Sequence, residues 1–332
     1  MKKKIIDVLV SLISVIPDFI LRLLEKFFLL SKYIVFSSRK KKNFKSTIFL
    51  QNKKIILNLK KNDHQAHDVY QALHKKKNIV YELPLIRFII EVFGQHNYNN
   101  FLDLGSFMGY YACVVGKIFE EKKINIYAIE SNPEYCQIIK KNIFENNLGN
   151  VQLINSALSD KNEELYVDNE NMLLETKKKG LQKIKSNTLD EICISKDINP
   201  EIIKFDVHGF EGKVLDGLLE NLKTKIKIII LELHSNSYLK KFSDSNKKEI
   251  INKLIRNEFN CYIVPYYGLL NLYNVPSNDK LESHKIPFRL IHEKNYEDLF
   301  FDKENNDNLI LCFKKDVKIE NFKCFYNLDK KN

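Results

Sequence analysis

Short apolar runs recur along the middle of the chain, separated by segments with helical periodicity. The runs have the length and near-continuous hydrophobicity of strands that are buried on both faces. Strands are predicted at Phe101–Leu104, Ile124–Ile129, Val151–Ile154, Ile202–Phe205, Lys227–Leu231, Cys261–Val264 and Leu309–Phe313. Helices are predicted at Tyr110–Phe119 and Asn132–Asn146. This alternation predicts an α/β fold with a doubly wound, mostly parallel, seven-stranded sheet.

Two further elements are predicted before this body. Alternating β-branched residues at Thr47–Gln51 and Ile55–Leu59 flank the polar connector Asn52–Lys54, as in a β-hairpin. The apolar density of Leu85–Phe93 predicts a buried helix that ends at Gly94. Between hairpin and helix lie three histidines whose spacing matches no metal motif and which we expect to be solvated: His64, His67 and His74.

The first part of the chain, residues 1–42, has a different pattern. A strongly apolar stretch, Ile5–Phe36, lies between the basic groups Lys2–Lys4 and Arg39–Lys42. Pro17 should kink or divide it. Its internal polar residues recur every three or four positions, on one narrow stripe of a helix: Asp7, Ser11, Ser14, Asp18, Arg22 and Glu25.

Three interpretations of residues 1–42 remain open. The basic flanks favour an amphipathic helix in a membrane interface. The helix can instead dock on the rest of the chain or on a second subunit. A true span is least favoured, because it needs about 20 apolar residues and the longest uncharged run, Val8–Pro17, is shorter.

The 332 residues therefore divide into four parts. We expect an amphipathic helical segment at 1–42, a hairpin and helical lead-in at 43–80, the main α/β domain at 81–320 and a tail at 321–332. The six cysteines form no C-x-x-C pair and no zinc spacing. Small buried thiols in a reducing compartment are therefore expected.

The formal charge of +11 invites a nucleic-acid or anionic-membrane partner. However, only five of the 53 basic residues are arginine, the residue that makes bidentate contacts with phosphate and guanine. Lysines that form a solvated surface are the simpler explanation. We therefore expect no nucleic-acid partner.

Candidate chemistry gathers at the predicted carboxyl ends of the strands, where doubly wound sheets bind ligands. The residues at these ends are Asp103, Gly105, Gly109, Glu130, Ser156, Asp206, His208, Glu232 and His234. The first turn, Asp103–Gly109, has neither the G-x-G-x-x-G of dinucleotide binders nor a P-loop lysine. Glu130 can accept two hydrogen bonds from a ribose diol. The glycine-containing first turn and Glu130 together predict a cofactor that contains a nucleoside. The acidic first turn favours a cofactor with an amino group and a sulfonium over one with a pyrophosphate.

Several motifs follow one another in a consistent order over roughly half of the chain. They are Tyr81-Glu82, Phe101-Leu-Asp-Leu-Gly105-Ser-Phe-Met-Gly109, Ile126-Tyr-Ala-Ile-Glu130-Ser-Asn-Pro133, Asn150–Asp160, Thr188-Leu-Asp190, Ile203-Lys-Phe-Asp206-Val-His-Gly209-Phe-Glu211 and Ile229-Ile-Leu-Glu232-Leu-His234. This set resembles the FkbM-type S-adenosylmethionine-dependent methyltransferases, which have a Rossmann-like class I fold. The resemblance implies methyl transfer from S-adenosylmethionine, usually to a hydroxyl oxygen of a sugar, a glycan, a lipid-linked precursor or another small metabolite.

The resemblance also implies the site residues. Cofactor contacts are expected from Tyr81, Glu82, Asp103, Gly105, Ser106, Gly109, Glu130, Ser131, Asn132, Ser156, Ala157 and Asp206. Acceptor contacts are expected from Glu211, Glu232 and His234. The catalytic residues are expected from their places after two neighbouring predicted strands, not from the resemblance: His208, Asp206 and His234.

Three positions depart from the family pattern. Ser106-Phe107 replaces Ala-Asn in the first turn, Ser131 replaces a proline, and His208 replaces the glutamate of D-V-E-G. His208 is the first candidate for the general base, because the ordinary histidine pKa of about 6.5 suits neutral pH. His234 is the alternative, and either histidine can instead be structural. No metal is expected, since no ligand spacing requires one; a divalent ion at Asp206, Glu232 and the histidines is the alternative.

A second function class stays open, in which the chain is a non-catalytic membrane-surface or scaffold protein with a methyltransferase fold. Phe107 and His208 would then be the lesions. The retained Asp103, Gly105 and Glu130 argue against this alternative. We expect a cytoplasmic protein. If residues 1–42 are interfacial, it is expected on the inner face of the cytoplasmic membrane. Homo-oligomerisation stays open.

Overall fold

The computed structural model describes residues 44–60, 79–168, 173–175, 182–264, 275–276, 286–292, 295–296, 299, 307–318 and 322–327. The predictions for residues 1–42 and for the three histidines His64, His67 and His74 lie outside the described residues. Within the described part, no helix is long and apolar enough to cross a membrane.

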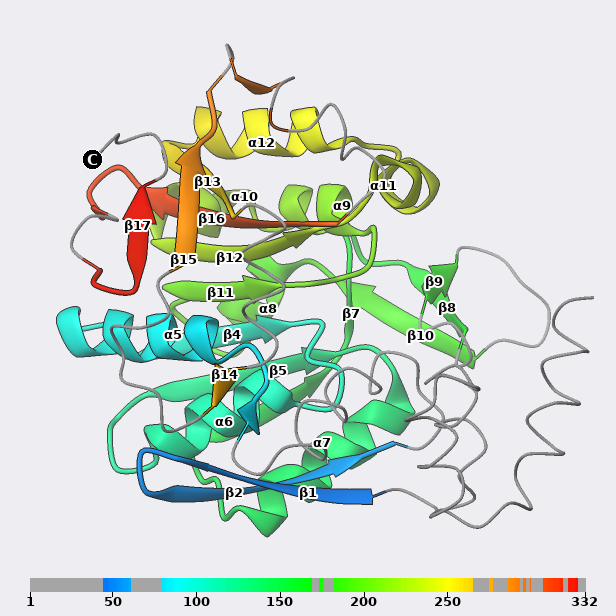
Figure 1. Ribbon diagram of the computed structural model, residues 1–332. Helices are drawn as coiled ribbons and strands as arrows, with labels where there is room; N and C mark the ends of the chain where they lie inside the picture. Colours follow the sequence, from blue (N-terminus) through cyan, green and yellow to red (C-terminus); the bar gives the residue numbers. More distant parts are fainter. Residues whose placement is uncertain are drawn as a thin grey trace, which may run out of the picture.

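Nine strands of the described residues form one sheet, in the order β17-β15-β13-β16-β12-β11-β4-β5-β6 (Figure 1). The five strands from β12 to β6 are parallel, and β16 runs antiparallel between β12 and β13. The predicted mostly parallel sheet is confirmed, and β15 and β17 extend it beyond β13. The strands are β4 (Asn100–Leu104), β5 (Asn125–Glu130), β6 (Val151–Asn155), β11 (Ile202–Phe205), β12 (Ile228–Leu233), β13 (Phe259–Val264), β15 (Ile286–Leu290), β16 (Asn308–Lys314) and β17 (Phe325–Asn327).

Alternate residues of the strands point into two cores on opposite faces of the sheet. On β4, Phe101 packs into the core that contains α5, α6 and α7, whereas Leu102 packs into the core that contains α8, α9, α11 and α12. Burial on both faces explains why the strands appear as continuous apolar runs. The described helices are α5 (Leu83–Gln95), α6 (Tyr110–Ile118), α7 (Pro133–Glu145), α8 (Leu189–Ser195), α9 (Glu211–Asp216), α10 (Leu219–Thr224), α11 (Asn236–Ser243) and α12 (Lys247–Arg256).

The predicted hairpin is confirmed as β1 (Phe44–Leu50) and β2 (Lys53–Leu59), which pair antiparallel. Gln51 and Asn52 form its turn with φ values of 48° and 62°, as a two-residue type I′ turn requires. The hairpin packs against α6 and α7, away from the centre of the sheet (Figure 1). Its buried side chains belong to the same core as those helices.

Two boundaries predicted from the sequence are wrong. Helix α5 continues through Gly94 to Gln95, because Gly94 does not adopt the left-handed conformation that ends helices. The tail predicted at 321–332 contains β17, which pairs in parallel with β15, and its residues Phe322 and Cys324 are buried.

A second sheet was missed by the sequence analysis, because its strands are short and mostly lack continuous apolar runs. Its order is β7-β10-β8-β9, and it lies beside the carboxyl end of β5 and β6 (Figure 1). Its strands, with the separate pair β3 and β14, are β7 (Ala157–Leu158), β8 (Glu164–Asp168), β9 (Leu173–Glu175), β10 (Gln182–Asn187), β3 (Ile79–Val80) and β14 (Val275–Pro276).

Candidate active site

The carboxyl ends of β4 and β11 lie side by side where the winding of the sheet reverses. The N–H of Asp206 donates to the carbonyl of Leu104 over 3.0 Å. Gly105 has a φ of 73°, and a Cβ atom there would lie 1.7 Å from the carbonyl oxygen of Asp206. Only glycine lets the first turn pass so close to the end of β11. The resulting crevice is where doubly wound sheets bind ligands.

Two adjoining parts of one cleft open at this edge of the sheet. The first, which we call the ribose part, includes these predicted cofactor residues: Gly105, Glu130, Ser131, Asn132, Ser156 and Asp206. The second, the acceptor part, has a volume of about 460 Å³ and includes Tyr81, Glu82, Asp103, Ser106, Glu232 and His234. Gly105, Phe107, Asp206 and His208 line both parts.

Two predicted cofactor residues do not line the cleft. Gly109 precedes α6 with a φ of 76°, and a Cβ atom there would lie 3.2 Å from Ile139. Ala157 is buried in β7, where it pairs with Ser186 of β10. Both residues therefore shape the surrounding backbone rather than contact a ligand.

Glu130 closes β5 with its carboxylate buried in the ribose part. The N–H of Phe107 donates to its Oε2 over 2.8 Å, and the N–H of Asn132 donates to its Oε1 over 2.7 Å. Burial raises the pKa of Glu130 to about 7, although these N–H groups act in the opposite direction. The Ser131 hydroxyl also donates to Oε1, over a long 3.5 Å. Because a carboxylate has about four lone pairs, Oε2 can accept one more hydrogen bond, and Oε1 can accept one in place of this long contact.

A buried lysine of β11, Lys204, lines the acceptor part of the cleft. The Nζ of Lys204 is 3.1 Å from Oδ2 of Asp206, and it lies 5.0 Å from the ring centroid of Tyr111. Burial alone would lower the pKa of Lys204, but the charges of four carboxylates raise it well above its ordinary value. These carboxylates are Asp206, Asp103, Glu232 and Glu82. The sequence analysis gave Lys204 no role, although a lysine inside an apolar central strand is a signal for a buried charge.

Two tyrosines of α6 hold the Tyr81-Glu82 segment against the cleft. The hydroxyl of Tyr111 donates to Oε2 of Glu82 over 2.5 Å, and the hydroxyl of Tyr110 donates to the carbonyl of Tyr81 over 2.5 Å. Burial raises the pKa of Glu82. These contacts explain how a segment before the sheet reaches the same site as the strand ends.

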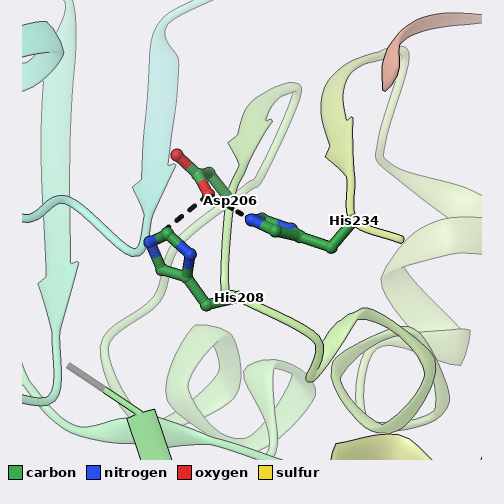
Figure 2. Close-up of side chains that lie close together, drawn as sticks. All are labelled: Asp206, His208 and His234. Carbon is green, nitrogen blue, oxygen red and sulfur yellow. Dashed lines mark ion pairs between the residues drawn. The ribbon is translucent and has the colours of Figure 1, made fainter. Parts of the chain in front are cut away.

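Asp206, His208 and His234 converge in the acceptor part (Figure 2). Oδ1 of Asp206 lies 4.0 Å from Nε2 of His208 and 3.9 Å from Nε2 of His234. The two imidazole centroids are 4.7 Å apart. The sequence spacing placed each histidine near a strand end, and the structure brings all three side chains together.

Glu211 lies behind this cluster rather than in the cleft. It is fully buried, and its Oε1 is 2.5 Å from Nδ1 of His234. The expectation that Glu211 contacts the acceptor is therefore wrong: packing of α9 against the sheet places its carboxylate under the imidazole. Glu211 positions His234 instead.

The pKa values of the three titratable groups around Asp206 are shifted differently; these groups are His208, Glu232 and His234. Burial alone would lower the pKa of His234, but Glu211, Asp206 and Glu232 raise it to about 10. Burial lowers the pKa of His208, against the opposing effect of Asp206. The charge of Asp206 and then burial raise the pKa of Glu232 to about 8.

Three residues with a strained backbone line the cleft. Glu82, Phe107 and His208 have φ values of 47°, 52° and 49°, a left-handed conformation that costs a non-glycine residue about 1–3 kcal/mol. All three residues line the acceptor part. Such strain persists where the surrounding structure enforces it, and it is typical of functional sites.

Three further residues that the sequence analysis missed line the acceptor part: Ser235, Tyr238 and Asp307. Ser235 and Tyr238 follow β12 by two and five positions, so proximity to a strand end was a usable signal for them. No local signal existed for Asp307, because it precedes β16 on a distant segment. Its Oδ1 accepts the N–H of Ser235 over 2.9 Å.

A family model described as the methyltransferase FkbM domain matches residues 93–261, which is half of the chain. The chain belongs to the FkbM methyltransferase family. Among characterised proteins, the hexuronic acid methyltransferase AglP of Haloferax volcanii is 27% identical over 165 residues, covering 47% of this chain and 66% of AglP. The match thus spans slightly less than two thirds of that relative.

Solved structures with similar folds include two methyltransferases. The FkbM methyltransferase of Methylobacillus flagellatus KT is 16% identical, with a TM-score of 0.34, and the alignment covers 50% of this chain and 40% of that one. The precorrin-6y C5,15-methyltransferase of Geobacter metallireducens GS-15 is 13% identical, with a TM-score of 0.35, over 66% of this chain and 81% of that one.

The cofactor of this FkbM family member is S-adenosylmethionine, which supplies an electrophilic methyl carbon on a sulfonium. The residues of the cleft fit it. Glu130 retains two positions for a ribose diol, and the carboxylates around Lys204 suit the positive amino group and sulfonium. Gly105 keeps the first turn open beside them.

Proposed function

We propose that this protein transfers the methyl group of S-adenosylmethionine to a hydroxyl oxygen of a sugar, either within a glycan or on a lipid-linked precursor. The observation that carries the proposal is the position of Asp206, His208 and His234. In an FkbM-family chain, this cluster adjoins the turn and the strand-end glutamate that fit the cofactor. Methyl transfer depends mainly on alignment of donor, methyl group and acceptor.

The lining of the acceptor part supports a sugar hydroxyl. Tyr81, Tyr110 and Tyr238 offer aromatic faces, and Ser235 offers a hydroxyl. Aromatic walls with a few polar groups are common in small-molecule sites. The name of the AglP relative also supports modification of a sugar.

The roles proposed for individual residues follow from their places in the cleft. Asp206, His208 and His234 surround the reacting oxygen and activate it. Glu232 lies beside them as an acceptor contact. We also propose residues 81–327 as the methyltransferase domain, since β17 belongs to its sheet. Residues 1–42 are proposed as a peripheral contact with the inner face of the cytoplasmic membrane.

The test has a binding step and a turnover step. Calorimetry should show that the purified full chain binds S-adenosylmethionine and S-adenosylhomocysteine, and Glu134→Gln, on the exposed start of α7, should bind both equally well. Mass spectrometry should then detect S-adenosylhomocysteine release with methyl glycosides of neutral sugars or of uronic acids. Absence of binding refutes the function. Binding without turnover, together with unchanged cell-surface glycans in cells lacking the gene, supports the non-catalytic alternative.

A further inference from the structure

The spacing of the Asp206, His208 and His234 cluster is unusual for three groups that can form ion pairs. Nε2 of each histidine lies 3.9–4.0 Å from the same oxygen, Oδ1 of Asp206. A direct charge-assisted hydrogen bond would be about 2.7–2.9 Å long. The candidate donor atoms of the three residues all lie within 4.8 Å of one another. Figure 2 shows the two rings on two sides of the carboxylate, around a common point.

The carboxylate at the centre of this cluster is only half satisfied. Oδ2 of Asp206 accepts a hydrogen bond from Lys204 over 3.1 Å. Oδ1 is buried and has no hydrogen-bond partner among the residues that the structure describes. A buried carboxylate oxygen without a partner is costly, so it indicates a missing ligand.

The orientation of His234 supplies the second observation. Its Nδ1 lies 2.5 Å from Oε1 of Glu211, and both side chains are at least nine-tenths buried. This contact turns Nε2 toward Oδ1 of Asp206. A carboxylate that holds one imidazole nitrogen, so that the other nitrogen faces an ion, is the usual arrangement behind a metal-binding histidine.

We propose that Asp206, His208 and His234 bind one divalent transition-metal ion through Oδ1, Nε2 and Nε2. Two imidazoles and one carboxylate suit zinc, iron, cobalt or nickel better than magnesium or calcium. Ligand atoms about 2.1 Å from a tetrahedral zinc are about 3.4 Å apart. The observed separations of 3.9 and 4.0 Å must therefore shorten by about half an ångström each, within the reach of small side-chain rotations.

Four carboxylates offset the positive charge of the nearby Lys204. Glu82, Asp103 and Glu232 act on that lysine together with Asp206. A second group of Glu232, His234 and Asp307 also has metal-binding spacing. It is the weaker candidate, because Asp307 is exposed and already accepts the N–H of Ser235.

The role of the ion in catalysis rests on the proposed function, whereas the metal-binding site itself does not. An ion here faces the acceptor part of the cleft, so a hydroxyl bound at its open side would have a lowered pKa. His208 would then act as a ligand and not as the free general base expected from the sequence. The substitution of histidine for the family glutamate would change the preferred metal rather than abolish the site.

The experiment measures metal binding without turnover. The full-length chain is stripped with a chelator, dialysed and titrated with Zn²⁺ by calorimetry and with Co²⁺ by visible absorption. Asp206→Asn and His208→Glu are compared with the matched control Asp307→Asn. The control shows whether the second group, Glu232, His234 and Asp307, contributes to binding.

One high-affinity ion per chain is expected for wild type and for Asp307→Asn. Asp206→Asn should bind it more than 100-fold more weakly, beyond the roughly 10–100-fold effect of losing a residue that merely orients a ligand. His208→Glu should keep the site and gain affinity for Mn²⁺ relative to Zn²⁺. Equal affinities in wild type and Asp206→Asn would overturn the proposal, as would loss of binding only in Asp307→Asn.

Two further measurements separate the outcomes. Circular dichroism shows whether Asp206→Asn is folded. If this variant is unfolded, the visible spectrum of Co²⁺ bound to wild type is the test instead. A spectrum without imidazole-ligated cobalt would overturn the proposed site. S-adenosylmethionine binding is measured on the same samples. Cofactor binding without metal binding refutes the ion and leaves the proposed function standing, and metal binding without cofactor binding does the reverse.

Discussion

Replacement of Glu130 tests how the cleft holds the cofactor. Each carboxylate oxygen accepts one backbone N–H, from Phe107 or Asn132, and has one position left. Two ribose hydroxyls can therefore bind. Charge-assisted hydrogen bonds contribute at least about 1.5 kcal/mol each, so Glu130→Ala should cost about 3 kcal/mol, or roughly 150-fold in Kd for S-adenosylmethionine.

The same substitution also removes two structural contacts. The N–H groups of Phe107 and Asn132 would lose their acceptor, so the melting temperature must be measured beside the affinity. Glu130→Gln separates the effects, because its single carbonyl oxygen can still accept one N–H while the ribose site loses its charge. We expect Glu130→Gln to be closer to wild type in stability than in affinity. Glu134→Gln, exposed at the start of α7, is the matched control.

The raised pKa of Glu130 predicts how affinity depends on pH. Burial raises the pKa of Glu130 from the ordinary 4.5 to about 7. The free protein therefore carries the ionised, ribose-binding form in about one tenth of molecules at pH 6 and about nine tenths at pH 8, which predicts roughly tenfold tighter binding at the higher pH. Glu130→Gln should lose this dependence.

The linked effect on stability has the opposite sign. Between pH 4.5 and about 7 the folded chain keeps a proton on Glu130 that the unfolded chain releases, so the contribution of this group to stability falls as pH rises through that window. Calorimetric titrations at several pH values, with thermal unfolding in the same buffers, provide the assay. An affinity for S-adenosylmethionine within twofold of wild type in folded Glu130→Ala would refute the ribose assignment.

Three other predictions address the rest of the site and the chain. His208→Asn, chosen because asparagine tolerates the left-handed backbone, should lower turnover by about 10²–10⁴ with little change in cofactor affinity; a loss below fivefold in a turnover assay would mean a structural histidine. Lys204→Met should lower the free energy of unfolding by about 3–5 kcal/mol in a denaturant titration, because it leaves buried carboxylates without a compensating charge. An equal loss in the control Lys213→Met, at a partly exposed lysine, would contradict this reason. Deletion of residues 1–42 should abolish sedimentation with anionic liposomes at low salt and preserve cofactor binding; equal sedimentation of both chains would count against a membrane contact.

The strands and their order along the chain were readable from the sequence. Burial on both faces of a parallel sheet makes Phe101–Leu104 and Ile202–Phe205 continuously apolar, and this signal needs no knowledge of neighbours. The edge of the sheet that binds ligands follows from the same reasoning, since parallel strands end at one edge. Hence Glu130, Asp206 and His234 were predicted to gather there, and the cleft contains all three.

Predictions from local sequence patterns were wrong or incomplete where the structure depends on residues far away in the chain. The second sheet has short strands with few apolar residues, and β17 pairs with β15, a strand far from it in the chain. Gly94 was taken as a helix end, although its solvent-facing position permits ordinary helical backbone. In each case the pattern within a few residues was compatible with more than one structure.

The fold class, the family motifs and the carboxyl-end residues could be predicted from the chain alone, because they depend on local periodicity and on the direction of strands. Which groups touch depends on how the elements pack. Packing of α9 places Glu211 beneath His234 rather than in the cleft, and the left-handed backbone of His208 brings its ring to Asp206. Lys204 gains its importance from carboxylates on three other segments. Such contacts join residues far apart in the chain, so no spacing rule could supply them.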